Sequence, residues 1–234
     1  MTREQESGYM SFTGIDGSGK SAIALGVAKN LMREISVACI GSLGQPSYLT
    51  TPNNTNTILY PALSRSCRKL YDEGQREDRD PMILMAFVLH SLICHRFAEP
   101  KAVKMGVNLV IRDRDPFVDP AIVLVSYDKG FIPKKLLWTC IGLVAHPHST
   151  DWLVHLATSP DVAIDRLQRR SFHDKHETVE VLTKASGHYD PIIQALLKQG
   201  YIKSSSTIVN NGNELEPIVD TVTNLTRNKF RRMF

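Results

Sequence analysis

The chain has 234 residues, 42% of them hydrophobic and 22% charged, a composition that excludes disordered and collagen-like proteins. Lys and Arg number 28 against 24 Asp and Glu. The net charge of +4 is too small to indicate a nucleic-acid binder, whose positive charge is clustered. Because this length can bury one core without disulfide support, we expect a single domain, residues 1–234.

The predicted elements alternate between short apolar strands and helices. Residues 9–13 predict a first strand, the spacing of apolar residues over 21–32 predicts a helix, and residues 36–40 predict a second strand. Residues 41–58 are rich in Gly, Pro, Ser, Thr and Asn and predict a loop. Pro81 opens a long apolar helix that extends to about residue 103.

The second half of the chain continues this alternation. The unbroken apolar run over 107–112 predicts a parallel strand that is covered on both faces. The remaining strands are expected at 152–156 and 207–209, and the remaining helices at 120–127, 160–170, 191–199 and 214–228. This pattern predicts an α/β fold, a three-layer sandwich with a central parallel five-stranded sheet and helices on both faces.

Neither a membrane span nor a metal-binding cysteine cluster is predicted. No apolar run approaches the roughly 20 residues of a membrane span, and the polar residues 1–7 do not resemble a secretory signal. The four cysteines are far apart and lack zinc-site spacing; they are Cys39, Cys67, Cys94 and Cys140. We therefore expect reduced thiols, no membrane partner and a cytoplasmic location.

The strongest motif is a phosphate-binding loop between the first predicted strand and helix. Its residues match G-x-x-x-x-G-K-[ST] and are Gly14, Ile15, Asp16, Gly17, Ser18, Gly19, Lys20 and Ser21. Glycines let backbone N–H groups converge on a phosphate, and the helix N-terminus adds the positive end of its dipole. We expect Lys20 to reach the β- and γ-phosphates of ATP and the Ser21 hydroxyl to bind Mg²⁺. We call Gly14 to Ser21 the P-loop.

Charged residues follow the third predicted strand directly, as Asp113-Arg114-Asp115. Ligands of open α/β sheets lie at the carboxyl ends of the strands. The Asp113 carboxylate can hold the shell of a magnesium ion there, and Arg114 can bind a second phosphate with both arms of its guanidinium. The alternative is a cluster of solvated charges at a strand end.

A second group of cations gathers at the end of the helix predicted over 160–170. Arg166, Arg169 and Arg170 precede a polar stretch that runs to Glu177. Arginines on a segment over a phosphate site can stabilise the charge of a transferring phosphoryl group. The alternative is that they only favour the negative end of the helix dipole.

At these residues the chain resembles the thymidylate kinase family, nucleoside monophosphate kinases of the P-loop class. The resemblance rests on residues 12–21, on Asp113-Arg114 and on residues 159–170. It implies a P-loop kinase domain with a lid at about 166–180 and an acceptor-binding region at about 44–120. In the family the carboxylate matching Asp16 faces the sugar hydroxyl of the acceptor, and the arginine matching Arg114 grips the acceptor phosphate.

The same resemblance implies which arginines are catalytic and where the chain departs from the family. The P-loop has no arginine and the lid has several, so the chain is similar to the lid-arginine type, with Arg169 and Arg170 catalytic and Arg166 near ATP. The family's Arg-Glu-Pro-like element is replaced by residues 44–47, its thymine-reading pair is missing from 86–96, and Asp115 stands where Tyr or His is usual. The phosphate-handling half is kept while the base-reading half is rewritten.

We therefore expect an ATP- and Mg²⁺-dependent phosphotransferase in nucleotide biosynthesis that acts on a nucleoside monophosphate, with dTMP as the leading candidate. One alternative is a P-loop kinase of a nucleoside or another small phosphorylated or hydroxylated metabolite, with Asp16 or Asp115 as the base. A further alternative is a non-catalytic nucleotide-binding module. A nucleic-acid partner has only residues 227–232 in its favour. A homodimer is suggested by the resemblance alone.

Overall fold

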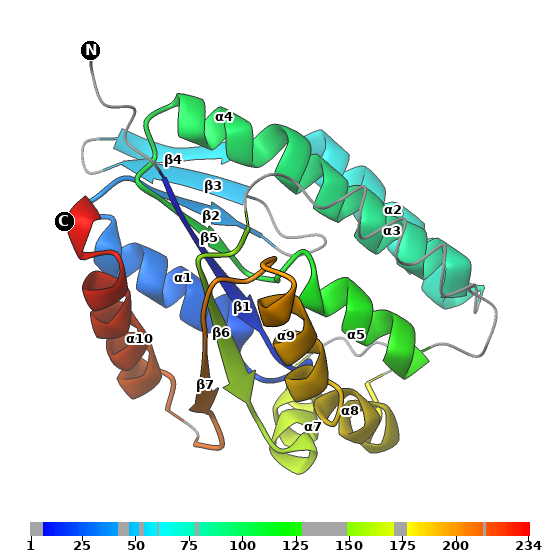
Figure 1. Ribbon diagram of the computed structural model, residues 1–234. Helices are drawn as coiled ribbons and strands as arrows, with labels where there is room; N and C mark the ends of the chain where they lie inside the picture. Colours follow the sequence, from blue (N-terminus) through cyan, green and yellow to red (C-terminus); the bar gives the residue numbers. More distant parts are fainter. Residues whose placement is uncertain are drawn as a thin grey trace.

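The computed structural model describes residues 7–41, 47–51, 54–59, 61–77, 80–127, 149–170, 177–212 and 214–234 (Figure 1). The strands in this part of the chain are β1 (Gly8–Thr13), β2 (Val37–Ile40), β3 (Ser47–Thr51), β4 (Asn54–Leu59), β5 (Leu109–Arg112), β6 (Trp152–Ala157) and β7 (Ser205–Val209). They form one sheet in the order β4–β3–β2–β5–β1–β6–β7. From β2 to β7 all neighbours in this order are parallel, so the predicted five-stranded parallel sheet is confirmed.

The prediction of a loop over 41–58 is wrong for most of that segment. β3 pairs antiparallel with β2, and β4 pairs antiparallel with β3, which extends the sheet to seven strands among the described residues. Thr, Tyr, Leu and Ile in these strands favour extended backbone. Their pairing depends on the edge of β2, a tertiary contact that the turn-forming residues around Pro52 hide in the sequence.

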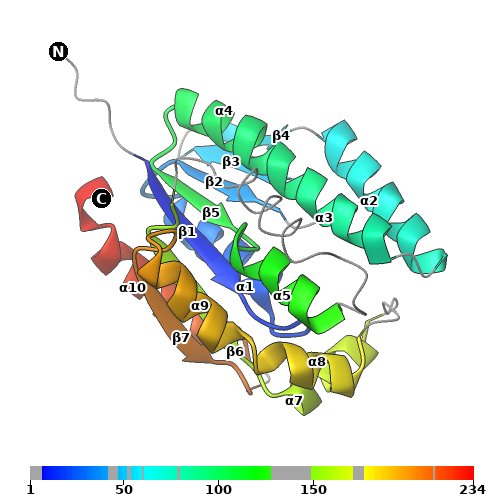
Figure 2. The same cartoon turned by 45° about the vertical axis from the view of Figure 1, so that its right-hand side comes forward.

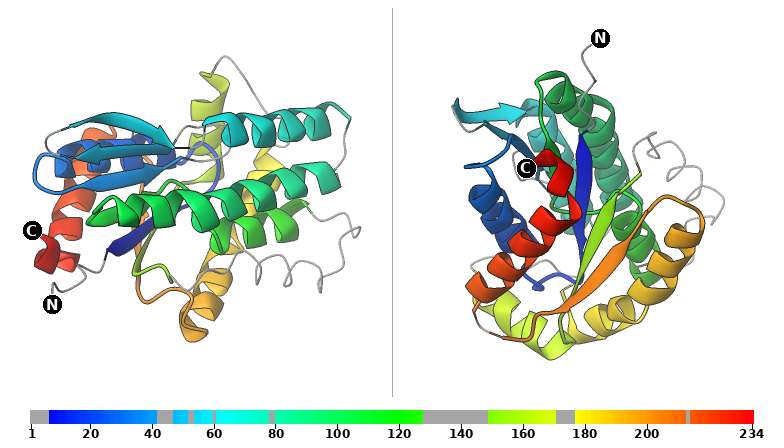
Figure 3. Two further views of the ribbon diagram at one scale, coloured as in Figure 1. Left: turned by 90° about the horizontal axis from the view of Figure 1, so that it is seen from above. Right: turned by 60° about the vertical axis from the view of Figure 1, so that its left-hand side comes forward.

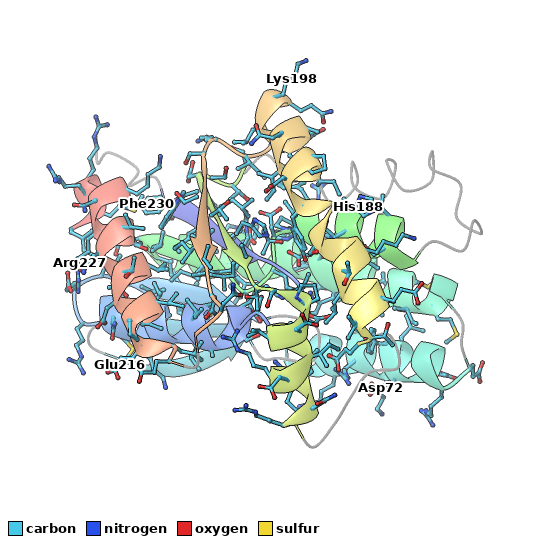
Figure 4. The ribbon with its side chains drawn as sticks, turned by 90° about the horizontal axis from the view of Figure 1, so that it is seen from below. Asp72, His188, Lys198, Glu216, Arg227 and Phe230 are labelled. Atoms are coloured by element: carbon cyan, nitrogen blue, oxygen red, sulfur yellow. The ribbon has the colours of Figure 1, made fainter. Side chains whose placement is uncertain are left out.

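Helices cover both faces of the sheet, so the predicted three-layer α/β sandwich is confirmed (Figure 3). One face carries α1 (Lys20–Leu31) and α10 (Glu216–Lys229), packed on Met10, Phe12 and their neighbours in β5 and β6. Figure 4 shows Glu216 and Phe230 at opposite ends of α10. The other face carries α4 (Glu99–Lys104), α5 (Val118–Tyr127), α8 (Val179–Ser186) and α9 (Tyr189–Lys198), with α7 (Pro160–Gln168) beside α8.

The predicted helix over 81–103 is a composite. It consists of α3 (Asp80–Ile93), a π-helical turn (Cys94–Ala98) and α4, which follow one another as a single rod (Figure 2). We call this rod the middle helix. Its α3 portion packs against α2 (Pro61–Arg76), which no sequence pattern above predicts. The π turn and α4 cover the β2–β5 side of the sheet.

Apolar side chains from β1, β5 and β6 enter clusters on both faces of the sheet, as expected for parallel strands covered by helices on both sides. Cys39, Cys67 and Cys94 are buried free thiols, while Cys140 lies outside the described residues. Among the described helices, none combines the length and the apolar character that a membrane span requires.

Candidate functional site

The P-loop leaves the central strand β1 and opens α1 at the carboxyl edge of the sheet. Gly17 and Gly19 have φ angles of 82° and 87°, a left-handed backbone that favours glycine. A Cβ atom on Gly17 would overlap the carbonyl oxygen of Ala163, so the loop also needs glycine for its close approach to α7. The loop is therefore shaped by its own glycines and by the helix beside it.

The Lys20 side chain folds back beneath the P-loop. Its Nζ donates to the carbonyl oxygens of Gly14 at 2.6 Å and Ile15 at 2.8 Å, and lies 3.7 Å from Asp16 Oδ1. Burial and the nearby Arg114 lower the pKa of Lys20 below its usual value, while the carboxylates around it oppose that shift. These contacts hold an ammonium group at the place where the motif predicts phosphate contact.

Ser21 and Asp113 meet although they are 92 residues apart. Ser21 Oγ donates to Asp113 Oδ2 at 2.8 Å, because β5, which ends just before Asp113, pairs with β1. A hydroxyl and a carboxylate are the hard oxygen ligands that suit Mg²⁺, which commonly takes one or two protein carboxylates and completes its shell with phosphate oxygens and water. No cluster of three or more His, Cys, Asp or Glu that could hold a metal occurs among the described residues. The pair fits the predicted role in a Mg²⁺ shell.

Arg114 lies between two carboxylates beside the P-loop. Its guanidinium donates to Asp16 Oδ1 at 2.6 Å and to Asp119 Oδ1 at 3.4 Å. Burial opposes ionisation of Asp16, but Arg114 and Lys20 outweigh it and hold the pKa of Asp16 well below its usual range. Burial raises the pKa of Asp119 to about 7, with Arg114 and Lys20 acting in the opposite direction. The structure thus brings Asp16, Lys20 and Arg114 into one charged group.

The predicted lid arginines have different surroundings. Arg166 donates to Gly17 O at 3.3 Å, to Asn210 Oδ1 at 3.2 Å and to Gly212 O, so it ties α7 to the P-loop and to the segment after β7. Arg169 is exposed and pairs with Asp165 at 2.6 Å. Arg170 is exposed and close enough to Asp16 to lower that carboxyl group's pKa. Of the lid predicted at about 166–180, residues 171–176 lie outside the described residues.

Asp115 does not have the surroundings of a general base. Its Oδ1 accepts from the backbone N–H groups of Phe117 and Val118, both at 2.9 Å, which caps the start of α5. Its Oδ2 accepts from Thr150 Oγ1 at 2.8 Å. Both oxygens are engaged and the residue is buried, so Asp115 positions the loop that carries Arg114.

A pocket opens next to Arg114, between the middle helix and the carboxyl ends of β2 and β5. About 400 Å³ of it is free of atoms, part of this open to solvent. Its lining residues are Ile40, Gly41, His90, Ser91, Cys94, His95, Arg114, Asp115, Asp119 and Pro120. We call it the acceptor pocket, since it lies within the acceptor-binding region expected at about 44–120 and Arg114 is the expected phosphate ligand.

A buried ion-pair network supports the wall of this pocket. Arg112 donates through Nε and Nη2 to the two carboxylate oxygens of Glu99, both at 2.8 Å, and Glu99 Oε1 lies 2.6 Å from His95 Nδ1. Arg112 Nη1 also reaches Thr150, which contacts Asp115. Burial opposes the charge on Glu99, but Arg112 and His95 hold its pKa well below the usual range.

Apart from Arg114 and Asp115, the residues of this pocket and of the ion-pair network behind it are not singled out by the sequence patterns. The signal present in the sequence is that His90, His95 and Glu99 interrupt an otherwise apolar helix and that Arg112 ends an apolar strand. Charged residues in such positions are buried only when they are paired. Compared with known proteins, the chain matches no protein-family model and no curated protein.

Proposed function

We propose that this chain is an ATP-dependent phosphotransferase that moves the γ-phosphoryl group of ATP to the phosphate of a small acceptor, a nucleoside monophosphate, with dTMP as the first candidate. The observation that carries the proposal is the convergence of Lys20, the Ser21–Asp113 pair and Arg114 at the carboxyl ends of β1 and β5. It supplies one group of residues for the donor phosphates and an arginine for a second phosphate beside it.

Phosphoryl transfer needs positioning and charge neutralisation more than covalent help from the protein. In the proposed reaction an acceptor phosphate oxygen attacks the γ-phosphorus, the bond from that phosphorus to the bridging oxygen breaks, and ADP leaves. Lys20 would neutralise the donor phosphates, and Arg114 would hold the acceptor phosphate with its two-armed guanidinium. Ser21 and Asp113 would hold Mg²⁺, which when bound supplies further positive charge at the donor phosphates.

The arginines of α7 complete this assignment. Arg166 is tied to the P-loop carbonyl of Gly17 and so would hold the loop in shape around ATP. Arg170 lies within electrostatic range of Asp16, and Arg169 is exposed next to it; both would stabilise the charge of the transferring group. A phosphate acceptor is already ionised near neutral pH, so the engagement of Asp115 in capping α5 does not hinder the reaction.

The test is release of ADP from Mg·ATP across a panel of monophosphates, nucleosides and sugars. We expect turnover with one or a few nucleoside monophosphates, and we expect that turnover to depend on added Mg²⁺. Such an enzyme would act in the cytoplasm. The Asp113→Asn variant should raise the Mg²⁺ concentration needed. If only a nucleoside or only a sugar supports turnover, the acceptor belongs to that class and not to the monophosphates. Tight ATP binding with no turnover on any acceptor would favour a non-catalytic module.

A further inference from the structure

The acceptor pocket has a polar wall that the phosphate-handling residues do not explain. His90, Ser91, Cys94 and His95 line it from the middle helix, opposite the segment that carries Arg114. His90 and His95 are 8% and 4% exposed. Buried imidazoles cost free energy unless they are hydrogen-bonded, so the partners of the two rings decide what each ring can offer to the pocket.

The π turn decides which side chain reaches the pocket. In an α-helix, residues five positions apart differ by about 140° around the axis, which would turn residue 95 away from His90. A π turn has more residues per turn, so each residue advances by a smaller angle and this difference is reduced. His95 is accordingly buried on the pocket side, while Arg96 is exposed and Phe97 is 52% exposed. The backbone thus departs from ideal helix geometry at the place that brings His95 into the pocket.

Glu99 fixes the role of each nitrogen of His95. Its carboxylate lies 2.6 Å from Nδ1, and both of its oxygens are held by Arg112, so Nδ1 carries the proton that it donates to Glu99. The hydrogen bond made by one imidazole nitrogen sets the state of the other. In the neutral ring, Nε2 is then a hydrogen-bond acceptor available to a molecule in the pocket.

The other histidine stays uncharged near neutral pH. Burial, then His95 and Arg114, lower the pKa of His90 to about 4. Its ring nitrogens lie 3.7 and 3.9 Å from Cys94 Sγ. The wall opposite Arg114 therefore combines a neutral ring, a thiol and an imidazole with a fixed proton, groups that suit an uncharged polar ring better than a second anion.

We propose that His95, held by Glu99 and Arg112, is the specificity-determining residue of the acceptor pocket and accepts a hydrogen bond at Nε2 from an N–H group of a heterocyclic base. This inference rests on the proposed function for the identity of the pocket and extends it by naming the residue that reads the base. It commits the acceptor to a base-bearing monophosphate that presents an N–H group and excludes a plain sugar phosphate.

The experiment measures binding by calorimetry on the full chain, with the four deoxynucleoside monophosphates and ribose 5-phosphate as probes. The wild type should bind at least one base-bearing monophosphate about tenfold or more tightly than ribose 5-phosphate. His95→Asn keeps an amide N–H near the position of Nδ1 for Glu99 and removes Nε2. It should abolish most of that preference while leaving the affinity for ribose 5-phosphate unchanged.

Two further variants separate recognition from structure. His95→Gln places an amide near the position of Nε2 but loses the contact with Glu99, so it should unfold at a lower temperature yet keep more of the preference than His95→Asn. Arg96→Gln, one position along the π turn and exposed, is the matched control and should behave as wild type. On the wild type itself, methylation of the N–H group of the preferred base should weaken binding by about tenfold, a test that needs no variant.

The inference is overturned if His95→Asn keeps the base preference, if it weakens ribose 5-phosphate equally, or if the wild type has no preference. Methylated and unmethylated bases that bind equally well would overturn it too. ADP release is scored separately. If the protein releases ADP but keeps its base selectivity in His95→Asn, only this inference is wrong. If it binds bases selectively but releases no ADP, the proposed reaction is wrong and the role of His95 is unaffected.

Discussion

The two sides of the proposed site, a donor side for ATP and an acceptor side for the second substrate, are built in different ways. The donor side is one continuous segment, Gly14 to Ser21, whose glycines and helix start shape the loop, with only Asp113 added from elsewhere. The acceptor side is assembled from β2, β5, α5 and the middle helix, and its wall depends on a π turn and a buried ion pair.

This difference explains why eight contiguous residues are enough to propose a chemistry for the donor side, while the proposed acceptor depends on residues from several segments. A phosphate loop has one task, so the same local solution serves many reactions. An acceptor pocket has to discriminate, and its discriminating groups come from segments far apart in the chain. The variants below separate the two sides, beginning with the largest expected effect.

Replacing Lys20 with alanine should impair the proposed donor side and leave acceptor binding unchanged. The ammonium group that would neutralise the transferring phosphoryl group is removed, and contributions of this kind in phosphoryl transfer are worth about 10³-fold or more. We expect ADP release to fall by about this factor, with acceptor binding by calorimetry unchanged. Lys29→Ala, an exposed lysine on the same helix, is the control and should keep full turnover. Full activity in Lys20→Ala would sink the proposed reaction.

Glu99→Gln should lower the free energy of unfolding, because it breaks the buried ion pair behind the acceptor pocket. Removing one partner of a buried ion pair leaves the other charge uncompensated, at a cost of about 3–5 kcal/mol in the free energy of unfolding. Glu34→Gln is the matched control, because Glu34 also pairs with an arginine, Arg227, but both side chains are about 40% exposed. That change should cost less than about 1 kcal/mol. Denaturant titration of both variants gives the comparison, and equal losses would show that the buried network contributes no more than a surface pair.

Arg114→Lys tests the boundary between the two sides. A lysine keeps the charge but loses the two-armed geometry that suits a phosphate. We expect the KM for the acceptor to rise by about 100-fold while the KM for ATP stays near the wild-type value. Arg33→Lys controls for the substitution itself, because Arg33 is exposed and follows the end of α1 that lies away from the P-loop. A rise in the KM for ATP of the same size would place Arg114 on the donor side instead.

Much of the fold could be predicted because its signals are local. The strands β1, β2 and β5 are short segments buried along their whole length, and the P-loop is contiguous, so both can be predicted without knowledge of their partners. The strands β3 and β4 are not, because their pairing depends on the edge of β2. Helix α2 could not be predicted either. Its sequence is mostly polar, and its few apolar positions, Cys67 and Tyr71 among them, are buried by packing on α3.

The acceptor pocket could not be predicted for a related reason. His95 lies in the π turn Cys94–Ala98, and no motif in the sequence marks a π turn there. Arg112 sits where an apolar strand ends, and its partner Glu99 lies 13 residues earlier on another element. A sequence pattern can show that such charges are unusual in an apolar setting. It cannot show that they meet.

The smallest predicted effect concerns the pH dependence of stability on the acceptor side. His90 has a pKa of about 4 in the folded protein against 6.5 ordinarily, mainly because it is buried. Between these two values the unfolded chain binds a proton at His90 that the folded protein does not, so stability is lost as the pH falls through this window. These two values set an upper limit of about 3 kcal/mol on the stability that this residue loses between neutral pH and about pH 4.

The measurement compares the free energy of unfolding of the wild type and His90→Gln across that window. The variant has no imidazole to protonate at this position, so its curve should be flatter by the same amount, even if its stability at neutral pH is lower. His188→Gln is the matched control, because His188 lies at the start of α9 (Figure 4) and is not among the residues that line the pocket. Parallel curves for wild type and His90→Gln would mean that His90 takes up its proton as readily in the folded protein as in the unfolded chain. The pocket wall would then be open to water and not the enclosed, uncharged surface that the reading of a base requires.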